Sequence, residues 1–278
     1  MRLRTRLTAG IGLGIVGAVG LCVGTGMWFI GGLIQDDVQR QLAGGSRQFN
    51  AEIATQAQRA QSMARLVANV PGFVDAFAAQ DRGALSAALL PAFPSLKADG
   101  FDQFQFHLPP ATSFLRVHAP AKFGDDLSGF RKTVVDANQG RREVRGLENG
   151  VAGIGIRAVS PVAKGDKHLG TVEFGFGFDK DFVAAFTERT GLRLALLVDK
   201  PKADGTSTRT LTASSFPKDQ TFDGAIVDGS EGHSETMSFD DRSWTVAGRP
   251  LVDFSGKRIG PFVMAADRTD LDAARTRA

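Results

Sequence analysis

The sequence predicts an α+β protein in which an N-terminal transmembrane helix and a long stalk helix precede two antiparallel sheets. Three observations support this fold class: an uncharged apolar run at residues 7–35, a proline-free helical pattern at 36–70, and two later regions with strand-type alternation. The 278 residues are 42% hydrophobic and 23% charged, so the chain can bury a sizeable core.

Residues 7–35 carry no charge and are long enough to cross a bilayer as a helix. A cleavable signal peptide has a shorter apolar region and a small-x-small cleavage site, so we expect a retained anchor. Arg2, Arg4 and Arg6 precede the run, whereas Asp36 and Asp37 follow it. The positive-inside rule then places residues 1–6 in the cytoplasm and the chain after residue 35 outside it.

Residues 36–70 are expected to continue the helix as a stalk. Apolar residues recur there at steps of three or four, and the stripe is thin and rich in alanine. Such a stripe packs either on the helix's own domain or on a second helix at a dimer seam, and both alternatives stay open. Gly44 and Gly45 mark the expected position of a kink or soft joint.

The next region, residues 71–190, combines a helix near 73–90 with period-two strands. In FDQFQFHL, Phe104, Phe106 and Leu108 alternate with polar residues, and SFLRVH repeats the pattern. A helix is expected near 128–138, strands at 143–147, 153–162 and 168–178, and a capped helix at 179–190. The order of helix, two strands, helix and three strands predicts a PAS-like sheet with helices on one side.

A second strand-rich region spans residues 191–268, followed by a tail at 269–278. Strands are expected from Leu192 and near 208–213, 243–251 and 258–265, with loops over most of 199–231. The segment RPLVDFSGKRIGPFVMA at 249–265 echoes SPVAKGDKHLGTVEFGF at 160–176. Both run from a strand through proline and a polar turn to Leu-Gly or Ile-Gly, which predicts a second sheet of similar design.

These features resemble the double Cache sensor domains of bacterial chemoreceptors and sensor kinases. The resemblance covers about residues 36–268 and is most specific from Phe104 to Phe178. It implies two PAS-like modules on one long helix, a small-molecule pocket in the membrane-distal module, and an extracytoplasmic location at a bacterial inner membrane. The absence of tyrosine means that the tyrosine-bearing amino-acid pocket of some relatives does not carry over.

Candidate ligand-binding residues lie on the strands of the first region. Arg116 and His118 share a face and would present a cation and a hydrogen-bond donor to an anion, or else pair structurally with nearby aspartates. Gly155 and Arg157 share a face, as do Glu173, Gly175 and Gly177, and the glycines would leave space over the sheet. Glu173 and Arg157 would form either a pocket pair or a plain cross-strand ion pair. The predicted set is Arg116, His118, Arg131, Arg157, Glu173, Phe106 and Asp126.

Other classes of function find little support in the sequence. The three N-terminal arginines account for the net charge of +3, which argues against nucleic-acid binding. The lone Cys22 and the spacing of the four histidines argue against a metal site, and no cofactor is expected. The Gly-x-Gly-x-x-Ala match at 153–158 lies in a strand instead of before a helix, so a dinucleotide fold is not predicted.

We therefore expect a homodimeric, non-enzymatic sensor that binds a small polar or anionic molecule, such as a carboxylate, and transmits a helix movement. The sequence contains no candidate output region after residue 268, so chemotaxis, phosphorelay and cyclic-dinucleotide signalling stay open. Two alternatives remain. One is a membrane-anchored module that binds a partner and has no ligand of its own, and the other is an anchored extracytoplasmic enzyme.

Overall fold

The computed structural model describes residues 2–150, 153–201, 206–229, 233–270 and 272–273. A single helix, α1 (Arg2–Ala68), includes both the expected span and the expected stalk. Within residues 2–36 of this helix, the side chains are described only at Leu21 and Thr25, so most of the expected span lies outside the described side chains. Across the part of the chain that was described, no helix has the length and hydropathy needed to cross a membrane.

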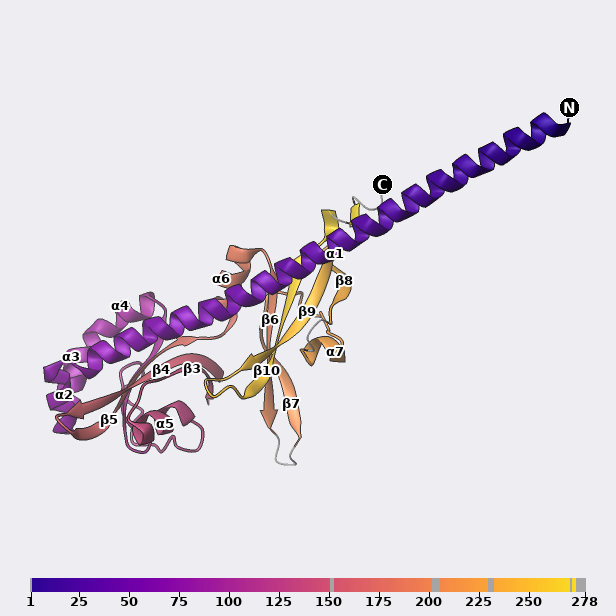
Figure 1. Cartoon of the computed structure of the whole chain (residues 1–278). Helices are drawn as coiled ribbons and strands as arrows, with labels where there is room; N and C mark the ends of the chain where they lie inside the picture. The colour runs from indigo at the N-terminus through magenta and orange to yellow at the C-terminus, as the bar shows by residue number, and fades with distance from the viewer. Residues whose placement is uncertain (1, 151–152, 202–205, 230–232, 271, 274–278) are drawn as a thin grey trace.

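The exposed and buried faces of α1 follow the predicted stripe. Its apolar residues pack on both sheets, and Phe49 contacts Phe178, Phe182 and Phe186 as well as Phe262 in the second sheet. The expectation of a kink at Gly44 and Gly45 was wrong, because the helix is continuous there (Figure 1). A Cβ at Gly45 would lie 2.2 Å from Leu192 Cδ1, so this glycine permits close packing instead.

The first sheet has the antiparallel order β2-β1-β5-β4-β3. Its strands are β1 (Phe101–Leu108), β2 (Thr112–Arg116), β3 (Val144–Gly150), β4 (Gly153–Lys164) and β5 (Lys167–Gly177). Its helices are α2 (Pro71–Ala78), α3 (Arg82–Leu89), the 3-10 helix η1 (Leu90–Ala92), α4 (Phe93–Ala98) and α5 (Lys132–Gly140). The expected helix at 73–90 is therefore interrupted. Gln80 has a φ of 53°, and Asp81 then caps α3 by accepting a hydrogen bond from Ala84 N.

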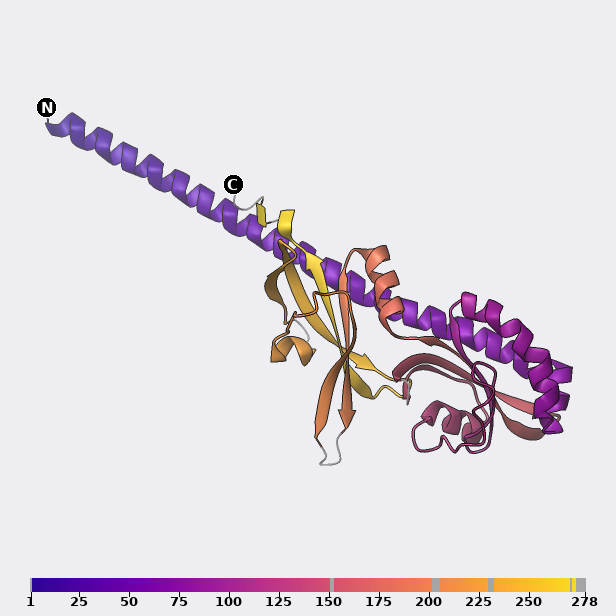
Figure 2. The same cartoon turned by 180° about the vertical axis from the view of Figure 1, so that it is seen from behind.

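Helices cover both faces of the first sheet, which corrects the expectation of helices on one side. Phe104, Phe106 and Phe174 lie on the face that packs against α1 and α2. The opposite face is covered by α5, whose Val134 packs in a separate cluster with Val144 and Val159 (Figures 1 and 2). The chain segment at 117–131, between β2 and α5, also lies over this second face.

The second sheet repeats the first in the order β7-β6-β10-β9-β8. Its elements are α6 (Lys180–Thr190), β6 (Arg193–Pro201), β7 (Ser207–Ser214), α7 (Gly224–Val227), β8 (Glu235–Phe239), β9 (Arg242–Val252) and β10 (Arg258–Asp267). The predicted echo is thus real, because β4–β5 and β9–β10 occupy the same places in their sheets. The sequence did not predict β8 or α7, since both are short and follow polar segments.

The Leu-Gly and Ile-Gly steps of the echo have a backbone cause. Gly170 and Gly260 have φ values of 152° and 154°, which residues with a Cβ rarely adopt. An added Cβ would lie 2.1 Å from His107 O in the first sheet and 2.1 Å from Leu197 O in the second. Both glycines therefore let the neighbouring central strand approach closely.

We predict that Gly170→Ala destabilises the protein by about 2–4 kcal/mol, because the methyl group clashes with backbone and the positive φ is strained. Chemical denaturation would measure the change. Gly72→Ala is the control, since its methyl group would meet no atom within 4 Å. Equal effects of the two substitutions would contradict the assigned role of Gly170.

Candidate functional site

Polar residues of the central strands gather on the face of the first sheet that lies away from α1. Gln105 and His107 on β1, Arg157 on β4 and Glu173 on β5 are all buried there. Because side chains alternate along a strand, the same alternation that places phenylalanines against α1 places these polar groups on the other face. A buried polar face needs internal partners, since unpaired polar groups lose their hydration.

A cavity of about 600 Å³ lies over this face. Its floor includes Gln103 and Gln105, and its wall is the segment between β2 and α5. The lining residues are Gln103, Gln105, Arg116, His118, Ala119, Ala121, Lys122, Phe123, Asp125, Leu127, Phe130, Arg131, Gly150 and Arg157. This volume is in the usual range for small-molecule sites.

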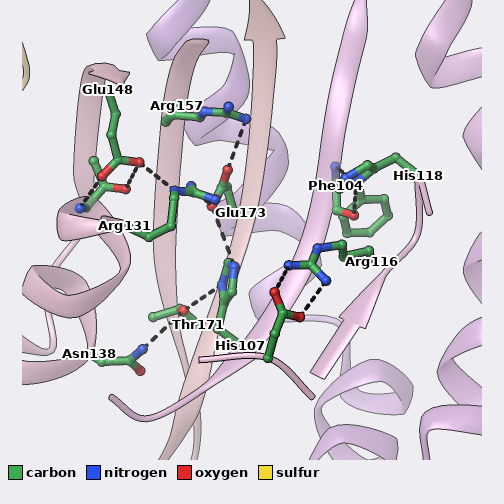
Figure 3. A network of polar contacts seen from close by, with 12 residues as sticks. Phe104, His107, Arg116, His118, Arg131, Asn138, Glu148, Arg157, Thr171 and Glu173 are labelled. Atoms are coloured by element: carbon green, nitrogen blue, oxygen red, sulfur yellow. Dashed lines mark hydrogen bonds and ion pairs between the residues drawn. The ribbon is translucent and has the colours of Figure 1, made fainter. Parts of the chain in front are cut away.

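Arg131, just before α5, connects two buried carboxylates (Figure 3). Its Nε donates to Glu148 Oε2 at 2.7 Å, and a terminal nitrogen donates to Glu173 Oε2. Glu148 also accepts hydrogen bonds from the backbone N and the hydroxyl of Thr133, at 2.7 and 2.8 Å. Burial opposes ionisation of Glu173, but Arg131 and Arg157 outweigh it and lower its pKa to about 2.

Arg157 is much less well paired than Arg131. Its Nη1 lies 3.4 Å from Glu173 Oε1, and its buried Nε has no hydrogen-bond partner among the residues the structure describes. Only 6% of the residue is exposed, and burial lowers its pKa. Cβ atoms at Gly155 and Gly175 would lie 2.7 and 3.2 Å from the Arg157 side chain. The Arg157 side chain therefore fills the space above these glycines, which corrects the expectation that this space is open.

Arg116 and His118 line the cavity on the β2 side. Arg116 donates to both carboxylate oxygens of Asp125, at 2.7 and 2.8 Å, and this bidentate pair lowers the pKa of Asp125. His118 Nδ1 lies 3.1 Å from the carbonyl oxygen of Phe104, and burial lowers the pKa of the imidazole. Arg116 was expected either to bind an anionic ligand or to pair with an aspartate. The structure shows the pairing with Asp125, and the pair lies at the cavity wall.

His107 lies beneath the cavity floor and is fully buried. Its Nδ1 is 3.3 Å from Thr171 Oγ1, and its Nε2 is 3.7 Å from Glu173 Oε2 (Figure 3). Burial lowers the pKa of His107 to about 3, so the ring is neutral at physiological pH. Thr171 is linked in turn to Asn138 of α5.

The structure brings four of the seven predicted residues to the cavity lining, namely Arg116, His118, Arg131 and Arg157. Glu173 lies beneath the lining and is the counterion of Arg131 and Arg157. Two predictions were wrong in position. Phe106 is on the other face, with its ring 5.2 Å from that of Phe77. Asp126 turns away and accepts hydrogen bonds from the backbone N and the hydroxyl of Ser128.

Glu148 and the floor residues Gln103 and Gln105 were not predicted from the sequence. The alternation in FDQFQFHL predicted a solvent-facing polar side, whereas tertiary packing covers it. Comparing the two echoed hairpins gives a usable signal. Arg157 pairs with Gly175 as Val246 pairs with Ala265 in the second sheet. The arginine of the first hairpin thus stands at the position that an apolar residue occupies in the second hairpin.

The corresponding face of the second sheet is filled by apolar side chains. Trp244, Val246 and Val263 pack there against Phe216 and Ile226. The polar cavity is therefore a property of the first sheet. Over the described ranges, no group of three His, Cys, Asp or Glu residues is arranged to hold a metal ion.

A comparison with known families agrees with the architecture. The dCache_3 family, described as the double sensory domain of two-component sensor kinase, matches residues 35–271. No curated protein sequence matches. The fold is similar to the periplasmic domain of Vibrio cholerae LuxQ, at 12% identity and TM-score 0.47 over 83% of this chain and 99% of that one.

A second similar structure is the ligand-binding domain of the Campylobacter jejuni chemoreceptor Tlp3 in complex with 4-methylisoleucine. The identity is 9% and the TM-score is 0.48, with 86% of this chain and 92% of that chain covered. A third is the ligand-binding domain of Mlp24 with asparagine, at 16% identity and TM-score 0.47 over 90% and 98% of the two chains.

We predict that Arg131→Met destabilises the protein by about 3–5 kcal/mol, because Glu148 and Glu173 lose their shared counterion inside the fold. Arg157→Met should cost less than about 1 kcal/mol, since removing a poorly paired buried cation relieves a desolvation penalty. Urea denaturation of both variants would measure the difference. Equal losses would show that Arg157 is as structurally important as Arg131.

The pKa values of His107 and Glu173 predict acid destabilisation. In the unfolded chain the histidine pKa is near 6.5, but in the folded protein it is about 3, so its contribution is present above pH 6.5 and is lost as pH falls towards 3. The contribution of Glu173 is present above about pH 4.5 and is lost towards pH 2.

Between pH 7 and 5, the wild type should therefore lose about 2 kcal/mol more unfolding free energy than His107→Gln. Denaturation at a series of pH values measures this, with His233→Gln in the second sheet as the control. If His107→Gln and the wild type share one pH profile, His107 is not the titrating group.

Proposed function

Because the chain belongs to the dCache_3 family of double sensory domains, we propose that it is the extracytoplasmic ligand-sensing part of a bacterial transmembrane receptor, either a chemoreceptor or a sensor kinase. The observation that carries this proposal is the open polar cavity at which the buried Arg157 lacks a full set of partners. A cation in this state costs stability, so an anionic ligand that pairs with it would bind favourably.

The first sheet is the sensing module in this proposal. Its charged cavity contrasts with the apolar, filled face of the second sheet. The site recognises a small polar or anionic molecule and makes or breaks no covalent bond. The ligand would be surrounded by Arg116, His118, Arg131 and Arg157. Beneath it, the carboxylate of Glu173 would partly neutralise Arg131 and Arg157.

Membrane anchoring is a further part of the proposal. Residues 7–35 are uncharged and follow three arginines, so they suit a span with its N-terminus inside. In Figures 1 and 2 the N-terminal part of α1 projects beyond both sheets, and the second sheet lies nearer to it than the first. The module at 71–190 would then be membrane-distal and that at 191–268 membrane-proximal, with most of the chain in the periplasm.

Strand β3 offers a route from the cavity to the rest of the molecule. Glu148 binds Arg131 at the site, and the adjacent Leu147 O accepts a hydrogen bond from Phe254 N of the second sheet's β9–β10 turn at 2.9 Å. Arg145 of the same strand donates to Gln58 on α1. A ligand that shifts Arg131 would thus bias contacts to both the second sheet and the helix.

The proposed receptor works as a homodimer, with helix movements carried along α1 through the membrane. Ala51, Thr55 and Leu66 are exposed and share one side of α1. Such a side is suited to a second helix, since Ala51 and Thr55 are small and Leu66 offers apolar surface to pack against.

The test is a thermal-shift screen of the purified full chain against organic acids, amines, amino acids, purines and inorganic anions. A ligand at 100 times its dissociation constant should stabilise the fold by about 2.7 kcal/mol. We expect a hit that Arg157→Met abolishes and the second-sheet control Arg209→Ala retains. Silence across the screen would favour a module that binds a protein partner, and a hit unaffected by Arg157→Met would place the site elsewhere.

A further inference from the structure

We infer that the cavity over the first sheet selects an organic monocarboxylate that carries no ammonium group, so that free amino acids are poor ligands. This inference rests on the proposed sensing function and specifies its ligand class. It follows from which charged groups at the site are already paired and which are not.

The carboxylate end of the ligand belongs at Arg157. This side chain lines the cavity, makes one long contact of 3.4 Å to Glu173 through a terminal nitrogen, and shares that glutamate with the better-placed Arg131. A guanidinium group offers planar, forked donors that match a carboxylate. Gln105, which also lines the cavity, carries an amide group that can donate to a second oxygen.

Among the described residues, the lining offers an ammonium group no acid that lacks an arginine partner. Asp125 is the one acidic residue of the described lining, and Arg116 already holds both of its oxygens. Glu148 and Glu173 lie beneath the lining and are held by Arg131. An ammonium group would therefore lose hydration and gain only a carboxylate whose charge Arg116 already neutralises.

The charge balance favours one negative charge on the ligand. Four cationic side chains line the cavity, namely Arg116, Lys122, Arg131 and Arg157, against the acids Asp125, Glu148 and Glu173 at or beneath the lining. The excess of one positive charge matches a monoanion. A zwitterion would leave this excess in place and add an unpaired cation next to three arginines.

The rest of the ligand meets apolar surface at the mouth of the cavity. Phe123 and Phe130 line it although they are 54% and 37% exposed, and Leu127 lies beside them. The guanidinium carbon of Arg82 lies 3.5 Å from the Phe123 ring centroid and so holds that ring in place. Exposed aromatic rings at a cavity mouth favour a ligand with an aliphatic or aromatic body.

Matched pairs of compounds test the inference by isothermal titration of the purified full chain. 3-Phenylpropanoate and L-phenylalanine differ only in the ammonium group, as do 4-methylpentanoate and L-leucine, and phenethylamine carries the ammonium alone. We expect each carboxylate to bind at least about tenfold more tightly than its amino acid, and the amine not to bind. Comparable or tighter binding of the amino acids overturns the ligand class.

Two variants connect the preference to the assigned groups. Arg157→Met should remove carboxylate binding, whereas Arg209→Ala in the second sheet should leave it unchanged. Arg116→Met releases Asp125 and should raise the affinity for the amino acids by about tenfold. If Arg116→Met leaves the amino acids as weak as before, Asp125 is not the acid that Arg116 withholds, and the inference fails.

The outcomes separate this inference from the function on which it rests. Tight amino-acid binding that depends on Arg157 would contradict the proposed ligand class but would still support the proposed sensing function. If no carboxylate binds but a purine or an inorganic anion from the thermal-shift screen does, the ligand class fails and the sensor stands. If no compound of that screen binds the full chain, while circular dichroism shows that it is folded, both proposals fail.

Discussion

The structure depends on one helix that completes two hydrophobic cores. The apolar stripe of α1 covers one face of the first sheet and continues onto the second, and Phe49 contacts aromatic rings from α6 and from both sheet regions. Neither sheet can reorient without disturbing packing against the same helix. A shift of one sheet would therefore also move α1, because packed interiors resist continuous deformation.

The opposite face of the first sheet follows a different rule. It is polar yet buried, so its stability requires pairing of charges inside the fold. Arg131 meets this requirement for two glutamates at once, and Thr133 supplies further donors to Glu148. Arg157 is left with one long contact to Glu173. The charge of Arg157 is thus only partly compensated within the protein, and a bound anion would supply the missing partner. Such local losses of stability are common at binding sites.

Strand β3 of the first sheet contacts the second sheet directly. Gly146 in β3 has a φ of 144°, and a Cβ there would lie 2.8 Å from Phe254 Cβ in the β9–β10 turn. The backbone of the first sheet therefore meets the second sheet directly, one residue from Leu147 and two from Glu148. Glu148 of the site and the contact with the second sheet therefore lie on the same strand.

Local patterns determined much of the fold. Alternation in FDQFQFHL and the echoed hairpins predicted strands in the right places, and the apolar stripe of α1 predicted which face of the helix is buried. Both succeed because side-chain periodicity follows directly from helix and strand geometry. The sequence predicted that Glu173 lies opposite Arg157, and the two are diagonal neighbours, because Arg157 pairs with Gly175 and Val159 pairs with Glu173. The interruption at Gln80 and the short β8 were not predictable, since neither has a strong periodic signal.

Tertiary structure alone decided which polar residues are buried and how they pair. From the sequence, Gln105 and His107 belong to the polar side of a half-exposed strand, and only packing of α5 and the segment at 117–131 turns that side into a cavity floor. The match of Arg131 to Glu148 and Glu173 joins residues from three elements. The sequence by itself determined the elements and their faces, because these depend on neighbours along the chain, whereas the site depends on contacts between segments far apart in it.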